Sequence, residues 1–322
     1  MKLGVLVNRA AGGGRAAEAA AALAAGLAGH EVWSVRGFGA ELAACQVTLE
    51  APDAALGYVA RVQAAARSLA AQAPDRLVLV GGDGFAAYVA DALLTAGMPV
   101  PPLIGVAGGT ANVGPIIALD ALPALDTLSF QPVGALEVLD DGGHIAYAFN
   151  DLVLGDTYLT TIDGRTVTAS AEALWRDGRT EPRQAARHIG DVTVGANGRQ
   201  TRTRLPRVAQ VVASTLERDR LYGRAVTGLL CFSPQSPYQA ALLLSERGIV
   251  SMEDSPLGFS APALFEQLLF TAADTVTVSG LADGISAIVD GNPYPRRGDI
   301  RLRYHERLLL AAEKKGETPW KR

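Results

Sequence analysis

Short apolar runs alternate with longer alanine-rich stretches along the first third of the chain. The apolar runs are typical of buried strands in a parallel sheet, and the predicted strands are Leu3–Val7, Val32–Val35, Leu77–Val80 and Leu103–Val106. Stretches rich in alanine and leucine favour helix, and the predicted helices cover residues 16–28, 57–71 and 86–94. Strands that alternate with helices indicate right-handed βαβ units. Such sheets bind ligands beyond the carboxyl ends of their strands.

From about residue 135 the pattern changes to short strands separated by turn signals at 141–143, 163–164 and 196–198. One helix is expected near 236–246 and another near 261–270. We therefore predict an α/β N-terminal domain with a parallel sheet over residues 1–134. A β-rich, mainly antiparallel domain should cover 135–312, and a charged tail 313–322. The predicted strands of the second domain are Leu136–Val138, Ile145–Phe149, Leu152–Leu154, Asp191–Val194, Val208–Ala213, Gly228–Phe232, Thr275–Val278, Ser286–Val289, Ile300–Tyr304 and Leu308–Ala311.

Composition narrows the class of protein. With 49% hydrophobic and 19% charged residues, the 322-residue chain can bury a sizeable core, which excludes global disorder. No apolar stretch approaches the ~20 residues that span a bilayer, and the opening residues lack the features of a signal peptide. The net charge of −4 argues against a nucleic-acid binder. Two cysteines, Cys45 and Cys231, fit a reducing compartment. We expect a cytoplasmic protein, and homo-oligomerisation stays open.

Charge is uneven along the chain. Residues 174–224 contain eleven arginines and five acidic residues, a local charge of +6 in a chain of −4. One interpretation is a solvated arginine-rich face. The other is a wall that attracts a phosphorylated ligand or an anionic surface.

The most specific motif is Gly81-Gly82-Asp83-Gly84, which lies between a predicted buried strand and a predicted helix. Glycines let the backbone approach a ligand closely, and amides at a helix start can face phosphate oxygens. A carboxylate would repel phosphate in a loop that only cradled it. A carboxylate that binds Mg²⁺ or accepts a hydroxyl proton fits better. The alternative is a tight turn in which Asp83 caps the helix.

A second glycine turn follows the next predicted strand. Gly109 and Thr110 offer amides and a hydroxyl, and Asn112 offers an amide side chain. Two such turns on neighbouring strands favour an anion site. The alternative is a pair of ordinary turns in a chain with 35 glycines.

These motifs resemble those of the superfamily that joins NAD kinases with bacterial diacylglycerol-type lipid kinases. Gly-Gly-Asp-Gly after a strand is found in both groups and is matched at 81–84. The Gly-Thr-x-Asn element of the lipid kinases is matched at 109–112. Asn8, followed by glycines 12 to 14, resembles the nucleotide loop of the same branch, with Arg9 where proline is expected.

The second half of the chain looks more like the NAD kinases. Asn150-Asp151 is similar to their Asn-Glu substrate motif, with aspartate in place of glutamate. The run from Gly228 to Tyr238 resembles another of their motifs. Asp290-Gly291 resembles a closing Asp-Gly strand that occurs in both branches.

The resemblance implies an ATP-dependent kinase that requires ATP and Mg²⁺, with Asp83 as the catalytic carboxylate or the Mg²⁺ ligand. It favours NAD, a related nucleotide or a small polyol as the acceptor, because Asn150 and Asp151 match the NAD kinase branch. The nucleotide contacts that it implies are Asn8, Gly81, Gly82, Gly84, Gly109, Thr110 and Asn112, and the acceptor contacts are Asn150, Asp151 and Asp290.

Three other hypotheses stay open. A lipid kinase is favoured by the Gly-Thr-x-Asn element. A nucleotide-binding regulator without activity is suggested by Phe85, which stands where the superfamily usually has threonine and cannot donate a hydrogen bond to phosphate. Glycines 12 and 14 fit a dinucleotide fingerprint, but no acidic residue closes the second strand, which argues against a dehydrogenase.

Overall fold

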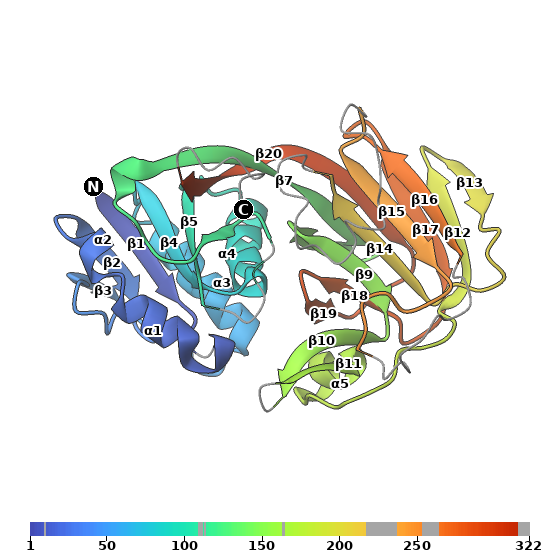
Figure 1. The fold of residues 1–322 in the computed structure, drawn as a ribbon, viewed down its shortest axis with the longest axis horizontal. Coiled ribbons are helices and arrows are strands. Elements are labelled where there is room, and N and C mark those ends of the chain that lie inside the picture. The colour runs from blue at the N-terminus through green and yellow to red at the C-terminus, as the bar shows by residue number, and fades with distance from the viewer. Residues whose placement is uncertain are drawn as a thin grey trace. The chain divides into compact units, whose positions relative to one another are not determined.

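The computed structural model describes residues 1–9, 11–108, 112, 114–162, 165–216, 237–252 and 264–314. The chain divides into two compact units. Unit 1 contains Met1–Gly134 together with the described residues from Glu306 onward, and unit 2 contains Ala135–His305. Figure 1 shows the helices and strands of both units.

Unit 1 is built on a parallel sheet in which the strands follow the order β5-β4-β1-β2-β3. All four pairs along this path are parallel. Short strand β6 and the end of β20 add to β5, the latter through Ala311 opposite Leu103. The elements are β1 (Lys2–Val7), α1 (Arg15–Ala21), α2 (Ala24–Leu27), β2 (Glu31–Val35), β3 (Val47–Leu49), α3 (Tyr58–Ala70), β4 (Arg76–Gly81), α4 (Asp83–Thr95), β5 (Leu103–Ala107) and β6 (Ile117–Leu119), with 3-10 turns at Ala11–Gly14 and Leu125–Thr127.

Helices cover both faces of this sheet because strand residues alternate between them. Leu3, Val5 and Val7 belong to one apolar cluster with residues of α1 and α2. Gly4 faces the other way, where a Cβ atom would lie 3.0 Å from the Leu69 side chain of α3. The apolar runs of β1 and β4 are therefore buried on both sides, as parallel strands require.

Unit 2 is β-rich and mainly antiparallel. One group of its strands pairs in the order β13-β12-β17-β20, with β7 pairing β20 and β8, and a second sheet has the order β16-β15-β14-β9-β18-β19. Strands β10 and β11 form a separate hairpin. Strands β7 and β20 are shared, since β7 begins in unit 1 and β20 ends there. The elements are β7 (Leu128–Asp140), β8 (Gly143–Ala148), β9 (Asp151–Gly155), β10 (Thr157–Ile162), β11 (Arg165–Ser170), α5 (Ala171–Asp177), β12 (Gly190–Ala196), β13 (Arg199–Arg202), β14 (Gln210–Thr215), β15 (Ala240–Ser245), β16 (Phe265–Phe270), β17 (Thr275–Leu281), β18 (Ser286–Val289), β19 (Asn292–Tyr294) and β20 (Ile300–Lys314).

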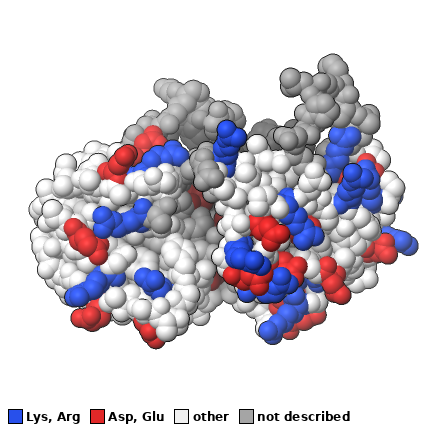
Figure 2. Space-filling model, turned by 90° about the horizontal axis from the view of Figure 1, so that it is seen from below, with Lys and Arg blue, Asp and Glu red and all other residues white. Residues whose placement is uncertain are grey.

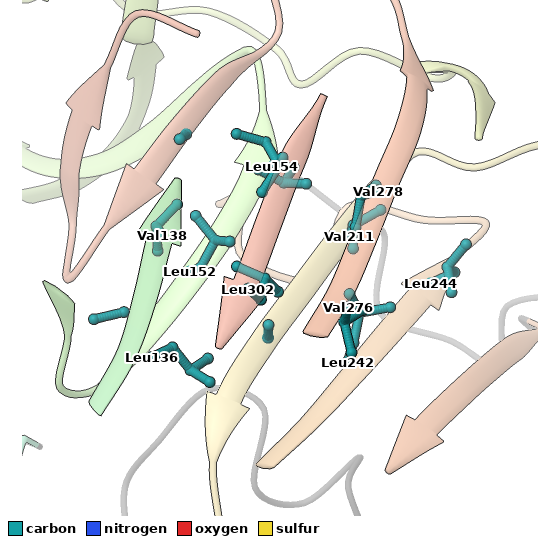
Figure 3. Packing of buried hydrophobic residues seen from close by; sticks show 14 of the residues in the cluster. Leu136, Val138, Leu152, Leu154, Val211, Leu242, Leu244, Val276, Val278 and Leu302 are labelled. Carbon is teal, nitrogen blue, oxygen red and sulfur yellow. The ribbon is translucent and has the colours of Figure 1, made fainter. Parts of the chain in front are cut away.

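The core of unit 2 lies between these two sheets. Figure 3 shows side chains of β7, β17 and β20 packed with side chains of β9, β14 and β15. Leu136, Val276 and Leu302 come from the first sheet, and Leu152 and Leu242 from the second. All are almost completely buried, which makes unit 2 a sandwich with an apolar interior.

The predicted fold class is confirmed, but several elements differ from the expectation. The helices predicted near 236–246 and 261–270 are wrong, because β15 and β16 occupy Ala240–Ser245 and Phe265–Phe270. A short apolar run such as that of β15 has the same appearance in a buried helix and in a buried strand. The strand predicted at 228–232 and the tail residues after 314 lie outside the described residues.

The last two predicted strands, Ile300–Tyr304 and Leu308–Ala311, are one continuous strand, β20. Its first part belongs to unit 2 and its last part to unit 1. Residues 306–312 therefore complete the N-terminal sheet instead of the second domain to which the sequence assigned them. In the described part of the chain, no helix has the length and apolarity needed to cross a membrane.

Shortening Leu242, which is buried between the two sheets, tests the packing of the sandwich core. Leu242→Ala should lower the free energy of unfolding by about 2–5 kcal/mol, because it leaves a cavity between two packed sheets. Urea unfolding would measure the change. Leu264→Ala is the control, since this leucine is 55% exposed and should cost less than about 0.5 kcal/mol. Equal effects of the two changes would contradict the packing described.

Candidate active site

Three glycine-containing turns meet at the carboxyl ends of β1, β4 and β5. The Asn8 amide after β1 donates to the carbonyl of Val80 in β4 over 2.9 Å. The Gly108 amide after β5 donates to the carbonyl of Gly81 over 2.8 Å. A Cβ atom on Gly12 would lie 2.3 Å from the Gly108 carbonyl oxygen. The three turns are therefore packed backbone against backbone at one edge of the sheet.

This packing requires glycine at two positions. Gly12 has a φ of 63°, a left-handed conformation that other residues rarely adopt. Gly108 has no room for a side chain, because its Cβ would lie 2.7 Å from the Cβ of Ala16 at the start of α1. The glycines thus let the turns pack closely beside the first residues of helices α1 and α4.

Asp83 is the first residue of α4, and the N-cap position belongs to Gly82. The Asp83 Oδ2 atom accepts a hydrogen bond from the amide of Gly114, 31 residues away, over 2.9 Å. A Cβ on Gly114 would approach the carboxylate to 2.9 Å. The capping interpretation of Asp83 therefore fails. Its carboxylate links the β4 turn to the segment after β5, near the positive end of the α4 dipole.

Phe85 is buried at 4% exposure in the first turn of α4. Its ring lies against Gly81, where a Cβ atom would be 2.8 Å from the Phe85 Cδ1 atom. The phenyl group therefore belongs to the core. It packs against the turn between β4 and α4.

The side chain of Asn8 lies near the hydroxyl group of Tyr58, the first residue of α3. The Tyr58 ring packs edge-on against Tyr88 of α4, with 6.5 Å between the ring centroids. Of the second predicted turn, Asn112 is described and is partly buried. Gly109 and Thr110 lie outside the described residues.

Unit 2 contains a second polar cluster, centred on the buried carboxylate of Asp290. Its Oδ1 atom accepts from the amides of Asn150 and Asp151, over 2.8 and 3.0 Å, and its Oδ2 atom from the amide of Phe149, over 3.0 Å. The Asp290 amide donates to the carbonyl of Asp151 over 2.9 Å. Asp290 itself has a left-handed φ of 48°. Asp290 is thus placed to hold the 149–151 backbone, whereas the sequence resemblance gave it a contact with the acceptor.

Burial raises the pKa of Asp290 to about 7, and the nearby charge of Asp151 acts in the same direction. The three backbone amides favour the ionised carboxylate and limit this rise. The group therefore changes its charge close to neutral pH.

Asn150 combines a buried side chain with an open hydrogen-bonding group. It is 8% exposed, and its Oδ1 atom is buried without a hydrogen-bond partner among the described residues. The Ser214 hydroxyl donates to the Asn150 carbonyl over 2.7 Å, which fixes the backbone at this point. A ligand hydroxyl or amine could supply the missing donor.

The arginine-rich segment contributes ion pairs. Arg176 and Arg179 bind Asp177, and Arg183 binds Asp156. Figure 2 shows basic and acidic side chains interleaved on the face it views. Arg218, Arg220 and Arg224 lie outside the described residues. Three of the arginines described within 174–216 are thus paired with carboxylates.

Comparisons with known proteins bear on both units. Residues 2–115 match the family model of the diacylglycerol kinase catalytic domain. An uncharacterized protein from Archaeoglobus fulgidus is 32% identical over 102 residues, which are 32% of this chain and 31% of that protein. The chain therefore spans about a third of the curated relative that it matches.

Two solved structures share the fold over nearly the whole chain. One is a diacylglycerol kinase from Bacillus anthracis str. Sterne, with 13% identity, a TM-score of 0.53 and coverage of 96% of each chain. The other is yeast NADH kinase complexed with NADH, with 14% identity, a TM-score of 0.52 and coverage of 99% of this chain and 84% of that one. The expected resemblance to the NAD kinase and diacylglycerol kinase superfamily is confirmed. The family model supports this resemblance over residues 2–115, and the two solved structures show the shared fold.

The raised pKa of Asp290 predicts how the stability of the folded protein depends on pH. Its folded-state pKa of about 7 exceeds the ordinary aspartate value, so the folded protein binds a proton more tightly than the unfolded chain does. The stability that this group contributes is complete below about pH 4 and is lost as the pH rises through 7. Asp290→Asn should remove this component from the pH dependence of unfolding, measured in urea between pH 4 and 8.

The same variant should also be less stable at each pH. An asparagine can place its oxygen toward two of the three amides, but its NH₂ group then meets the third. A buried amide without an acceptor costs about 1–3 kcal/mol. Asp283→Asn is the control, since this aspartate is exposed in the same unit. An unchanged pH dependence in Asp290→Asn would contradict the raised pKa.

Proposed function

We propose that the protein transfers the γ-phosphoryl group of ATP to a hydroxyl group of a small-molecule acceptor. The observation that carries the proposal is the carboxylate of Asp83, fixed at the start of α4 beside three interlocked glycine turns. Phosphoryl transfer needs little covalent chemistry from the protein. It depends on positioning the reactants and stabilising charge, and closely packed glycine turns beside a carboxylate and the start of a helix suit both tasks.

The nucleotide phosphates would bind at these turns. Backbone amides of Gly81, Gly82 and Gly84 and the positive end of α4 attract anionic oxygens. Asn8 and Asn112 would add amide side chains. Gly109 and Thr110 complete the set that the family resemblance implies.

Asp83 would act as the general base or as a ligand of Mg²⁺. The described residues contain no group of three or more metal-binding side chains. Mg²⁺ is commonly held by one or two carboxylates together with the substrate phosphates, so the single carboxylate of Asp83 fits an ion that arrives with ATP. The bound ion would neutralise charge on the phosphate oxygens. Asp83 would orient the acceptor hydroxyl or take its proton.

For the acceptor we propose NAD, a related nucleotide or a small polyol. The buried Asn150 Oδ1 atom needs a donor, and the adjacent Asp151 carboxylate can accept bonds from two vicinal hydroxyls. A ribose or polyol offers such a pair. The match to the diacylglycerol kinase catalytic domain over residues 2–115 supports a lipid acceptor as the second candidate.

A nucleotide-binding regulator without activity is the remaining alternative. It was suggested by Phe85, which cannot donate to phosphate. The burial of Phe85 against Gly81 weakens that argument, because the residue contributes to the core beneath the turn.

Asp83→Asn should reduce turnover by about 10²–10⁴-fold, the usual contribution of a general base. The asparagine oxygen can keep the bond to the Gly114 amide, so the melting temperature should stay near that of the wild type. Phosphate transfer from ATP with Mg²⁺ is measured against a panel of NAD, polyols and diacylglycerol. Asp120→Asn, an exposed change in the same unit, is the control. Near-native turnover in Asp83→Asn would remove Asp83 from the catalytic position.

Asp151→Ala tests the choice of acceptor. It should raise the acceptor KM or lower kcat with NAD, because the carboxylate loses its bonds to vicinal hydroxyls, and it should leave ATP binding intact. A lipid acceptor has one free hydroxyl and predicts little change. Activity with NAD that is indifferent to Asp151→Ala would contradict the assignment.

A further inference from the structure

A cavity of about 570 Å³ lies in unit 1 at the amino ends of the parallel strands. Met1 precedes β1, His30 precedes β2 and Arg76 begins β4, and all three residues line the cavity. The glycine turns follow the carboxyl ends of the same strands. The two ends of β1 are roughly 17 Å apart, since a strand rises ~3.3 Å per residue. A molecule bound in this cavity is therefore separate from the glycine turns.

Most of the lining is apolar and continuous with the core. Ile104 of β5 and Leu128 of β7 are buried in the apolar cluster that β1 forms with α1 and α2. Leu125 and Phe130 pack against the same cluster. A concave site with apolar walls and a few polar groups is the usual form of a small-molecule pocket. Helix α2 and the residue after it leave room there, because they contribute only small residues to the lining: Ala25, Gly26 and Ala28.

Arg76 brings a positive charge to the lining and is partly buried. Its guanidinium carbon lies 4.6 Å from the centroid of the Phe130 ring, and its Nη1 atom donates to the Asp75 carbonyl over 2.7 Å. The ring and the carbonyl hold the guanidinium in place. No acidic side chain in the described part of the chain pairs with it. Arg76 therefore has a positive charge and further N–H donors to offer a ligand.

Two other polar side chains line the cavity. The Nδ1 atom of His30 is buried and has no hydrogen-bond partner among the described residues. Buried polar atoms are normally paired, so a ligand could supply the missing partner. Asp126 is exposed in the 3-10 turn at Leu125–Thr127. Water screens its charge more than that of the partly buried Arg76, so the polar groups together favour a negatively charged ligand.

We propose that this cavity binds a small organic anion in which one carboxylate is joined to an apolar body. The carboxylate would accept hydrogen bonds from the planar guanidinium of Arg76, which matches carboxylate geometry. The Nδ1 atom of His30 would donate a further bond in the tautomer that carries its proton there. The apolar body would cover Leu125, Leu128 and Phe130. This ligand is distinct from the nucleotide and the acceptor of the proposed reaction.

Octanoate is a suitable probe, because it joins a carboxylate to an apolar chain. Calorimetry on the full chain would compare its binding with that of acetate, octanol and octylamine. Acetate lacks the apolar body, octanol lacks the charge, and octylamine carries the opposite charge. Octanoate should bind at least about 10-fold more tightly than each of the three, because only octanoate satisfies both the apolar walls and the guanidinium.

Arg76→Met tests the contact with the carboxylate. The variant removes the charge and keeps an apolar chain against Phe130. It should weaken octanoate binding on the order of 10–100-fold, the loss expected for a hydrogen bond to a charged group. Arg67→Met is the matched control, because Arg67 is exposed in α3 and does not line this cavity.

Ala25→Leu tests the cavity itself. Ala25 is exposed, belongs to α2 and lines the cavity, so a leucine there should fill part of the space without disturbing the core. It should weaken octanoate binding about 10-fold and leave the melting temperature near that of the wild type. Ala22→Leu should change neither, because Ala22 is exposed and does not line this cavity.

Several results would overturn the inference. Absence of octanoate binding to the wild type would show that the cavity is a packing gap. Tighter binding of octylamine would make Asp126 the polar contact and reverse the charge of the ligand. Equal effects of Arg76→Met and Arg67→Met, or competition between octanoate and ATP, would place octanoate elsewhere in the molecule. The turnover of Asp83→Asn is a separate measurement, so each of these results leaves the proposed function standing.

Discussion

The candidate site depends on how closely three backbone turns approach one another. Gly12 and Gly108 meet without side chains between them, and Gly108 is hydrogen bonded to Gly81. Backbone contact of this kind is stiff, because no rotamer can relax to absorb a displacement. This packing fixes the position of Asp83. Its carboxylate lies at the start of α4 and accepts a hydrogen bond from the segment at Gly114.

In both units a carboxylate holds a separate segment of backbone, and the carboxylate of unit 2 is the more deeply buried. In each, a carboxylate on one segment binds backbone amides of another, through Gly114 in unit 1 and through residues 149–151 in unit 2. The Asp290 carboxylate accepts hydrogen bonds from three backbone amides, so it fixes the shape of the loop that contains Asn150. Asp83 is the less enclosed of the two. The same residue type thus links separate segments in both units, and in unit 1 we propose that it also takes part in the chemistry.

Local signals made most of unit 1 and its main motif predictable. A buried apolar run followed by glycines identified β4 and the start of α4, and the alternation of strands and helices gave the parallel sheet. Helix α5 was missed although its signals are present: Ser170 accepts from the amide of Ala173, and Gly178 ends the helix in a left-handed conformation. The partners of Asp83 and Asn8 could not be found in this way. Gly114 and Tyr58 reach them only through the fold, and neither carries a local signal.

The course of β20 has a consequence for how the chain acquires its structure during synthesis. Residues 1–134 are translated before unit 2, yet Leu103 in the N-terminal sheet pairs with Ala311, which is translated after unit 2. Nascent chains usually fold domain by domain from the N-terminus. Here the edge of β5 pairs with a strand that is translated after the whole of unit 2. The N-terminal sheet therefore stays incomplete until the residues after unit 2 have been made, and until then the part of β5 near Leu103 is open to pairing with other strands.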